Sequence, residues 1–288
     1  MNATAADDAP LDRIRVVSLN ILDPVHADWP RRREVLRTGL QALDADVVAL
    51  QEVVRDDDHD TVRDLLGEGW QVVWNSRHAP GGTGAALASR WPIGDIREVD
   101  EPVSARATRS CVWCTSTLVV VEAPAPFGPV VVVHHKPTWP YTFEYERELQ
   151  AVATARAAEE VLTGGGIRHA ILLGDLDATP DSASIRFLTG RQSLHGMSVC
   201  YRDAWEAVHP HDPGHTFTPR NRLVRAGDMP ADPGRRIDYV MVRCGHHGPT
   251  LDVVDCRRLF VDEIGGVQAS DHYGVLADLT PPARPPAS

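Results

Sequence analysis

Two aspartates, Asp175 and Asp177, follow directly after an apolar segment, residues 170–173, which predicts a buried strand. Gly174 ends that segment, and Pro180 closes the turn that follows. Side chains two positions apart on an extended end point the same way, so both carboxylates face one side. Because two like charges side by side repel each other, such a pair needs water, a proton or a cation beside it. The segment is the first candidate for a metal or acid–base site.

Acids, amides and imidazoles mark other predicted strand boundaries as well. These residues are Asn20, Gln51, Glu52, His134, His135, Asp238, Asp271 and His272. Each one alone has an ordinary explanation, such as a strand terminus or a solvated surface, but their joint occurrence indicates one shared site. Carboxylate and amide oxygens suit hard cations such as Mg²⁺, which takes few protein ligands and keeps several waters.

The hydrophobic pattern predicts the elements that must position these side chains. The predicted strands are residues 14–19, 46–50, 70–75, 85–89, 112–122, 129–135, 171–173, 236–242 and 275–279. The predicted helices are residues 33–43, 61–66, 144–162 and 182–188. The alternation is irregular and several strands have hairpin-length links, which excludes a plain parallel doubly wound sheet. The pattern favours an α/β fold in which two mixed β-sheets pack face to face with helices outside.

The chain has 288 residues, of which 43% are hydrophobic, and shows no internal repeat or composition break between residues 13 and 280. We therefore expect a single catalytic domain over residues 13–280, with flexible tails at residues 1–12 and 281–288. No segment resembles a signal peptide or a membrane span, and the five cysteines are too few for a disulfide framework. These features predict a cytoplasmic protein with free cysteines.

The net charge of the chain helps to predict the kind of substrate that it binds. The formal net charge is −11, and Lys136 is the only lysine. Proteins that bind long nucleic acids without sequence preference normally present a basic face. The charge therefore favours a small or lipid-like anionic substrate over duplex DNA, although a local basic groove is compatible with an acidic total.

Taken in chain order, seven short motifs resemble those of the endonuclease/exonuclease/phosphatase superfamily, whose fold is DNase I-like. They are Ser18-Leu19-Asn20, Leu50-Gln51-Glu52, Gly84 with Ser89-Arg90-Trp91-Pro92-Ile93, Val133-His134-His135, Gly174-Asp175-Leu176-Asp177, Arg236-Ile237-Asp238-Tyr239 and Ser270-Asp271-His272. The resemblance extends from Ile14 to Leu279. It implies a four-layer α/β sandwich that hydrolyses a phosphoester with Mg²⁺ or Mn²⁺.

The resemblance also implies a role for each matching residue. Glu52 matches the principal metal ligand, Asp271 a residue near the metal, and Asn20 the amide that helps to hold metal or phosphate. His272 matches the reactive histidine, and Asp238 matches the carboxylate that orients its imidazole.

Further matches concern the attacking water and the phosphate. Asp175 matches the acid that positions or deprotonates the water, and His135, preferred over His134, matches the histidine that binds the scissile phosphate. Asp177 stands where the family usually has Asn. A carboxylate cannot donate a hydrogen bond to phosphate, so Asp177 either binds a second cation, has its pKa raised by Asp175, or has another role such as turn formation.

The segment after His135 is the expected substrate-binding loop. Lys136 could hold a second phosphate, and Trp139 or Tyr141 could stack on a ring of the substrate. The alternative is an exposed lysine with the aromatic side chains packed on the next helix.

These inferences predict a Mg²⁺- or Mn²⁺-dependent phosphoesterase that hydrolyses a phosphodiester or phosphomonoester of a small molecule or lipid-like substrate. A metal-dependent nuclease acting on DNA or RNA is the first alternative. The second alternative is a binding protein that keeps the fold without catalysis. The complete set of Glu52, Asp175, Asp238 and His272 argues against that second alternative.

Overall fold

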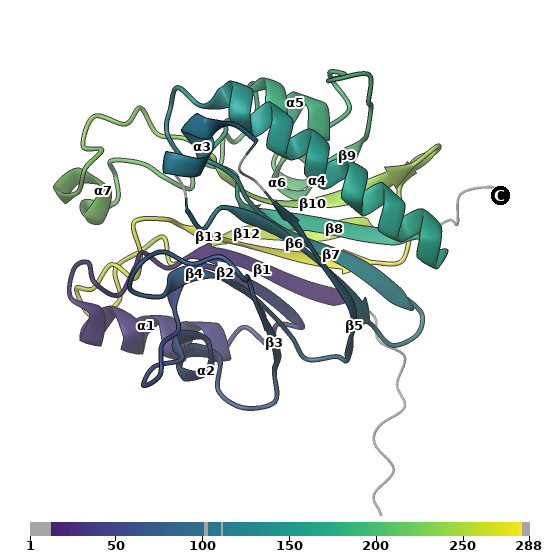
Figure 1. Cartoon of the computed structure of the whole chain (residues 1–288). Coiled ribbons are helices and arrows are strands. Elements are labelled where there is room, and N and C mark those ends of the chain that lie inside the picture. The colour runs from purple at the N-terminus through teal and green to yellow at the C-terminus, as the bar shows by residue number, and fades with distance from the viewer. Residues whose placement is uncertain (1–12, 101–102, 111, 284–288) are drawn as a thin grey trace, which may run out of the picture.

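A computed structural model describes residues 13–100, 103–110 and 112–283. Two mixed β-sheets lie face to face between two layers of helices (Figure 1). The first sheet has six strands in the order β12-β13-β1-β2-β4-β3. Its strands are β1 Ile14–Asn20, β2 Val47–Val54, β3 Gln71–Trp74, β4 Thr83–Ser89, β12 Asp252–Leu259 and β13 Gly274–Thr280.

The second sheet has seven strands, in the order β11-β10-β8-β7-β6-β5 with β9 paired to β10. Its strands are β5 Ile93–Asp100, β6 Thr115–Glu122, β7 Pro129–Lys136, β8 His169–Asp175, β9 Tyr201–Asp203, β10 Asp238–Gly245 and β11 Gly248–Pro249. β7 and β8 run parallel, whereas β8 and β10 are antiparallel. This arrangement confirms the predicted pair of mixed sheets.

Helices cover the outer face of each sheet (Figure 1). α1 Trp29–Gln41 and α2 Thr61–Leu66 pack on the six-stranded sheet, and α4 Glu144–Gly165 with α5 Ala183–Leu188 packs on the seven-stranded sheet. The remaining helices are α3 Ala105–Ser110, α6 Ala204–Val208 and α7 Arg222–Ala226. α7 lies at one end of the sandwich, away from both helical layers (Figure 1).

The central strands are buried on both faces, and side-chain alternation decides which hydrophobic core each residue joins. In β7, Val130 and Val132 pack in the central core between the sheets. Val131 and Val133 instead pack beneath α4. This alternation continues to the last residue of each strand. It therefore determines whether the side chain at a strand end points between the sheets or toward the helices.

The structure differs from the sequence-based expectations in some elements. The strand expected at residues 112–122 begins only at Thr115, because residues 112 and 113 form a turn after helix α3. The polar strands β5 and β12 carry too few buried apolar side chains to show a strand pattern. Cys114 is disulfide-bonded, so the expectation of free cysteines is wrong for this residue.

None of the helices in the described part of the chain is long and apolar enough to cross a membrane. The expected N-terminal tail, residues 1–12, lies outside the described residues, as do residues 284–288 of the expected C-terminal tail.

Candidate active site

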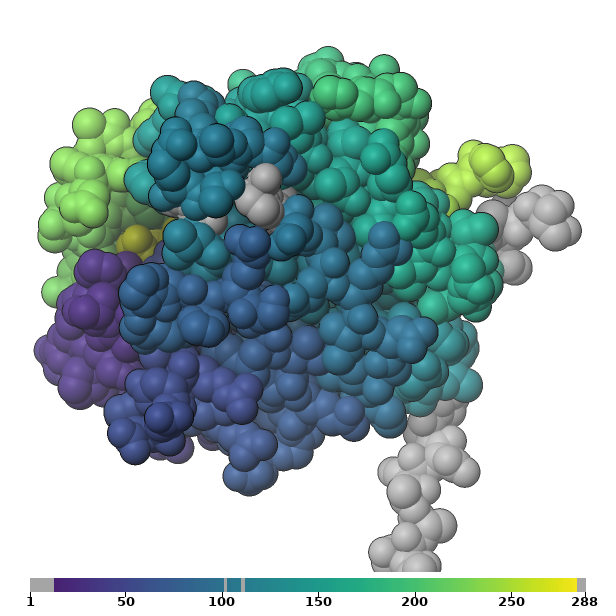
Figure 2. Space-filling view, in the orientation of Figure 1, coloured from purple at the N-terminus to yellow at the C-terminus, as the bar shows by residue number. Residues whose placement is uncertain are grey.

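Strands from both sheets end at one cavity of about 580 Å³. The six-stranded sheet contributes Asn20 and Glu52, and the seven-stranded sheet contributes Lys136 and Asp175. Alternation along the strands turns Asn20, Lys136 and Asp175 toward the inner face of their sheets. A bulge in β2 turns Glu52 toward the same cavity. In Figure 2, the light-green segment that carries α7 and the purple N-terminal segment meet at the same edge of the molecule.

Glu52 lies at an irregularity in β2. The pairing of β2 with β4 shifts register between Gln51 and Val53, which leaves Glu52 as the extra residue of a bulge. Its φ of 61° is in the left-handed region, which a non-glycine residue rarely adopts. The bulge turns the Glu52 carboxylate into the cavity.

Asn20 links the acids of the two sheets. Its Nδ2 donates to Oε1 of Glu52 at 2.9 Å and to Oδ2 of Asp175 at 3.1 Å. The backbone N–H of Leu22 donates to Oδ1 of Asn20 at 3.0 Å, which fixes the orientation of the amide. Asn20 therefore holds the two carboxylates in place, and its oxygen is already engaged by the backbone.

Glu52 and Asp271 fit a hard cation. Both carboxylates line the cavity, and neither forms an ion pair with a basic side chain among the described residues. Burial raises the pKa of Asp271, although the charge of His272 acts in the opposite direction, and the charge of Glu52 raises it further. The charge of the buried Arg32 acts on both carboxylates without a direct ion pair. Carboxylates that line a cavity in this way are the donor set that Mg²⁺ or Mn²⁺ prefers.

Lys136 lies between two carboxylates on the opposite side of the cavity. Its Nζ lies 2.9 Å from Oδ2 of Asp175 and donates to Oδ2 of Asp177. Burial alone would raise the pKa of Asp175, but the charges of Lys136 and His272 lower it to about 2. Burial and repulsion by Asp175 raise the pKa of Asp177 to about 6. Asp175 is therefore ionised at neutral pH.

His272 and Asp238 form a buried pair. Nδ1 of His272 lies 2.9 Å from Oδ2 of Asp238, and the ring of Phe217 lies 5.0 Å from the imidazole, centroid to centroid. Burial would lower the pKa of His272, but Asp238 and Asp175 together raise it well above its ordinary value. Ligand atoms of Asp175, Asp238 and His272 lie within 4.8 Å of one another. A protonated imidazole cannot bind a metal, so this cluster fits acid–base work better than coordination.

The structure does not bring His135 to the cavity. Alternation along β7 points His135 to the outer face, where Nδ1 lies 2.5 Å from Oγ of Ser116 and 3.4 Å from Oγ1 of Thr154 in α4. His134 faces inward but is enclosed, with Nε2 2.7 Å from Nε2 of Gln51. Burial lowers the pKa of each histidine to about 3. Lys136, two positions after His134, is the β7 side chain that reaches the cavity.

An apolar wall completes the cavity, and it was not predicted from the sequence. Phe217, Val224 and Ile237 form a small buried cluster with Met229 packed against it. All four line the cavity, together with Trp113 and the half-exposed Trp139. A five-residue helix such as α7 shows no periodicity in a sequence, which is why this wall was not predicted.

Tyr141 does not line the cavity directly. Its hydroxyl donates to Asp232, and Arg235 lies over its ring at 4.4 Å from the centroid. Arg235 also pairs with Asp232 at 2.7 Å and lines the cavity. Tyr141 therefore supports Arg235.

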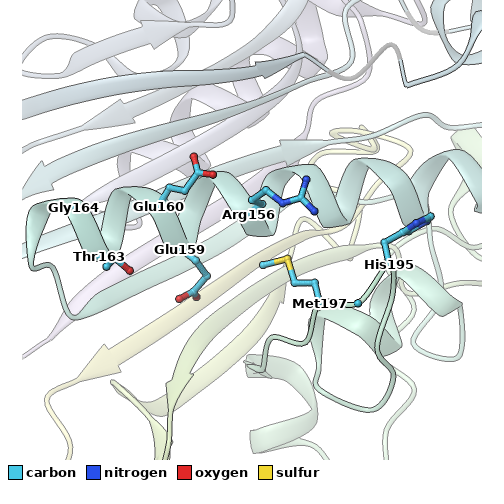
Figure 3. A pocket seen from close by; sticks show the side chains of 8 residues that line it. Arg156, Glu159, Glu160, Thr163, Gly164, His195 and Met197 are labelled. Atoms are coloured by element: carbon cyan, nitrogen blue, oxygen red, sulfur yellow. The ribbon is translucent and has the colours of Figure 1, made fainter.

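A second hollow, of about 650 Å³, lies along the outer side of α4 (Figure 3). The acids there already have partners, because Glu159 pairs with Arg243 at 2.6 Å and Glu160 pairs with Arg97 at 2.8 Å. His195 and Met197 border it from a short turn. This hollow lacks the convergent polar groups of the first cavity and is not a candidate for the chemistry.

Comparison with known proteins agrees with the fold. The profile of the Endonuclease/Exonuclease/phosphatase family matches residues 17–272. The chain therefore belongs to this family, and its fold is the DNase I-like four-layer α/β sandwich. No curated protein matches the sequence.

Several solved structures share the fold at low sequence identity. TDP2 from D. rerio, complexed with a single-strand DNA product, is 15% identical with a TM-score of 0.72, and the match covers 93% of this chain and 99% of that one. The human Nocturnin catalytic domain with a bound sulfate is 20% identical with a TM-score of 0.66, and the match covers 96% of both chains. An endonuclease/exonuclease/phosphatase from Bacteroides vulgatus is 20% identical with a TM-score of 0.70, and the match covers 94% and 99%.

Proposed function

We propose that this chain is a Mg²⁺- or Mn²⁺-dependent phosphoesterase whose catalytic domain spans residues 13–280, and that it hydrolyses a phosphodiester or phosphomonoester of a small or lipid-like molecule. The observation that carries the proposal is one cavity that joins the acids of both sheets, a charged His272 and an apolar wall. Family membership supports hydrolysis of a phosphoester. The net charge of −11 and the apolar wall support a small or lipid-like substrate.

The metal site of this proposal is formed by Glu52 and Asp271, with Asn20 holding Glu52 in position. A divalent ion bound there would neutralise charge on the phosphate oxygens. Asp177 is not included among its ligands, because Lys136 already serves as its counter-ion.

The chain's own residues supply the other parts of the reaction. Asp175, with its low pKa, orients a water molecule for attack and is a weak base, so its contribution is positioning. His272 in its protonated form donates a hydrogen bond to the phosphate, and Asp238 holds its ring and stabilises its charge. Lys136 replaces His135 in our assignment of the phosphate-binding group.

The substrate assignment follows from the two halves of the cavity. The cavity is lined by the cationic side chains of Lys136, His272 and Arg235, and these suffice to bind one phosphate group. The wall of Phe217 and Val224 can take an apolar or aromatic group attached to that phosphate. A long nucleic-acid backbone would need a row of further basic side chains.

The proposal is tested with a panel of aryl, alkyl and lipid phosphomonoesters and phosphodiesters, assayed with Mg²⁺, Mn²⁺ and Ca²⁺. We expect turnover of an aryl or acyl-chain ester with Mg²⁺ or Mn²⁺. Absence of turnover across the panel, in a protein that binds the metal, would reject it in favour of a binding protein.

A metal-dependent nuclease is the second candidate, and the likeness to TDP2 bound to a single-strand DNA product favours it. Cleavage of single-stranded DNA or RNA, with an affinity that falls steeply as salt rises, would support this candidate. Cleavage of the small esters alone would support the first.

A further inference from the structure

Three charged side chains form a compact group on the floor of the cavity. The Lys136 ammonium lies between the carboxylates of Asp175 and Asp177, and contacts both. The side chains of Lys136, Asp175 and Asp177 are 3%, 1% and 10% exposed. An unpaired charge at this depth would be strongly unfavourable, so the three groups depend on one another.

The backbone departs from ordinary geometry at two positions to build this group. Gly174 has a φ of 151°, and a Cβ at this position would lie 2.0 Å from the carbonyl oxygen of His135. Only glycine therefore lets β7 and β8 approach closely enough beside Lys136. Asp177 has a φ of 51°, a left-handed conformation that is unfavourable for aspartate but keeps its carboxylate next to Lys136.

Two carboxylates that face each other across a few ångströms form an arrangement that ordinarily takes a divalent cation. Here the ammonium group of Lys136 fills the space between Asp175 and Asp177. Lys136 sits on a strand that is paired on both sides, so its position is fixed by the sheet. A metal ion cannot bridge the two acids while this ammonium group is present.

We propose that Lys136 is a built-in second cation: its ammonium group stands where a second metal ion would bridge Asp175 and Asp177, and the protein binds one divalent ion only. This inference rests on the proposed phosphoesterase function. It explains why a carboxylate is acceptable at position 177 beside an anionic substrate, because Lys136 balances its charge.

The same ammonium group can also contact the substrate. An ammonium has three N–H donors, and Asp175 and Asp177 are the two acceptors that it contacts among the described residues. The third N–H is left for a phosphate oxygen in the cavity, which Lys136 lines. Lys136 thereby acts as a fixed positive charge that chelators cannot remove.

The test is the number of Mn²⁺ ions bound per chain, measured by calorimetric titration and by electron paramagnetic resonance of free Mn²⁺. We expect one ion in the wild type. In Lys136→Met, which leaves the two acids without a counter-ion, we expect a doubling to two ions. Two ions in the wild type, or one ion at saturating Mn²⁺ in a folded Lys136→Met protein, would overturn the inference.

Two control variants complete the experiment. Asp177→Asn removes one of the two acids but keeps Lys136, and we expect it to bind one ion as the wild type does. Lys136→Met/Asp177→Asn removes one charge of each sign and should also bind one ion. This double variant shows whether a second ion requires both carboxylates or only the loss of the lysine. A second ion in either control would overturn the inference.

The result is independent of the substrate panel. A wild type that hydrolyses an ester but binds two ions would refute the built-in cation and leave the phosphoesterase proposal intact. A wild type that binds one ion and hydrolyses no ester would refute the function instead.

Discussion

The two sheets contribute different electrostatic arrangements to the same cavity. On the side of the six-stranded sheet, Glu52 has no basic partner among the described residues. On the side of the seven-stranded sheet, Asp175 is paired with Lys136, and Asp238 is paired with His272. The difference supports the proposed place of the metal ion: direct ion pairs neutralise the acids on one side of the cavity, and no direct ion pair is formed by Glu52 on the other.

The largest expected effect comes from removing the acid without a partner. Glu52→Ala should lower kcat/KM by on the order of 10⁴-fold and weaken Mg²⁺ affinity, because a bound ion supplies several kcal/mol to the transition state. The fold should persist, since among the described residues the Glu52 side chain forms hydrogen bonds only with Asn20 and the backbone N–H of Asp23. Steady-state kinetics over a Mg²⁺ titration, with circular dichroism for the fold, measure this. Glu68→Ala, at an exposed position, is the matched control. Unchanged kinetics at limiting Mg²⁺ would reject the assigned role.

The paired side should instead show a loss of stability. Lys136→Met leaves Asp175 and Asp177 buried beside each other, and breaking such a buried pair costs about 3–4 kcal/mol. Urea unfolding in the absence of metal measures the loss. Adding Asp177→Asn should restore most of it, because one charge of each sign has then been removed. Additive losses in the double variant would contradict the pairing.

The His272–Asp238 pair predicts a change in the pH profile. The pKa of His272 is raised, so its protonation stabilises the fold fully below the ordinary histidine pKa, and this contribution is lost as the pH rises through the raised value. Asp238→Asn lowers that pKa. We expect the alkaline limb of kcat/KM to move to lower pH and the maximal rate to fall by roughly 10²-fold. An alkaline limb at an unchanged pH would show that another group controls it.

The smallest effect is expected at the apolar wall. Trp139→Ala should raise KM for an aryl phosphoester about fivefold, since an aromatic contact contributes about 1 kcal/mol, and leave kcat nearly unchanged. A methyl phosphoester is the control substrate, because it has no ring to contact the wall. An equal change in KM for both esters would mean that Trp139 does not act through contact with the aryl ring.

The strand ends were the predictable part of the site, for a physical reason. Asp175 follows an apolar strand and a glycine, and Asp238 and His272 stand in short motifs at strand boundaries. Such residues are fixed by local sequence. The direction of His135 and Lys136 was not predictable in this way. Since β7 is apolar on both faces, the pattern does not show which set of alternate residues points inward.

The parts that the sequence did not reveal depend on contacts between distant segments. The wall combines Phe217, Val224 and Ile237 with Trp113, and no periodicity links them. The edge strand β12 has an exposed Val254 and charged neighbours, so it resembles a loop in sequence. The contact between Lys136 and Asp177 joins the end of β7 to the turn after β8, and no local sequence pattern shows it.

The bulge at Glu52 affects which variants would survive a screen for thermal stability. Replacing Glu52 by glycine would relieve its left-handed backbone, and deleting it would restore an uninterrupted ladder between β2 and β4. Either change removes the carboxylate. A screen for thermal stability alone would therefore enrich variants that lack the Glu52 carboxylate and are inactive. A screen for turnover would retain Glu52 and its bulge.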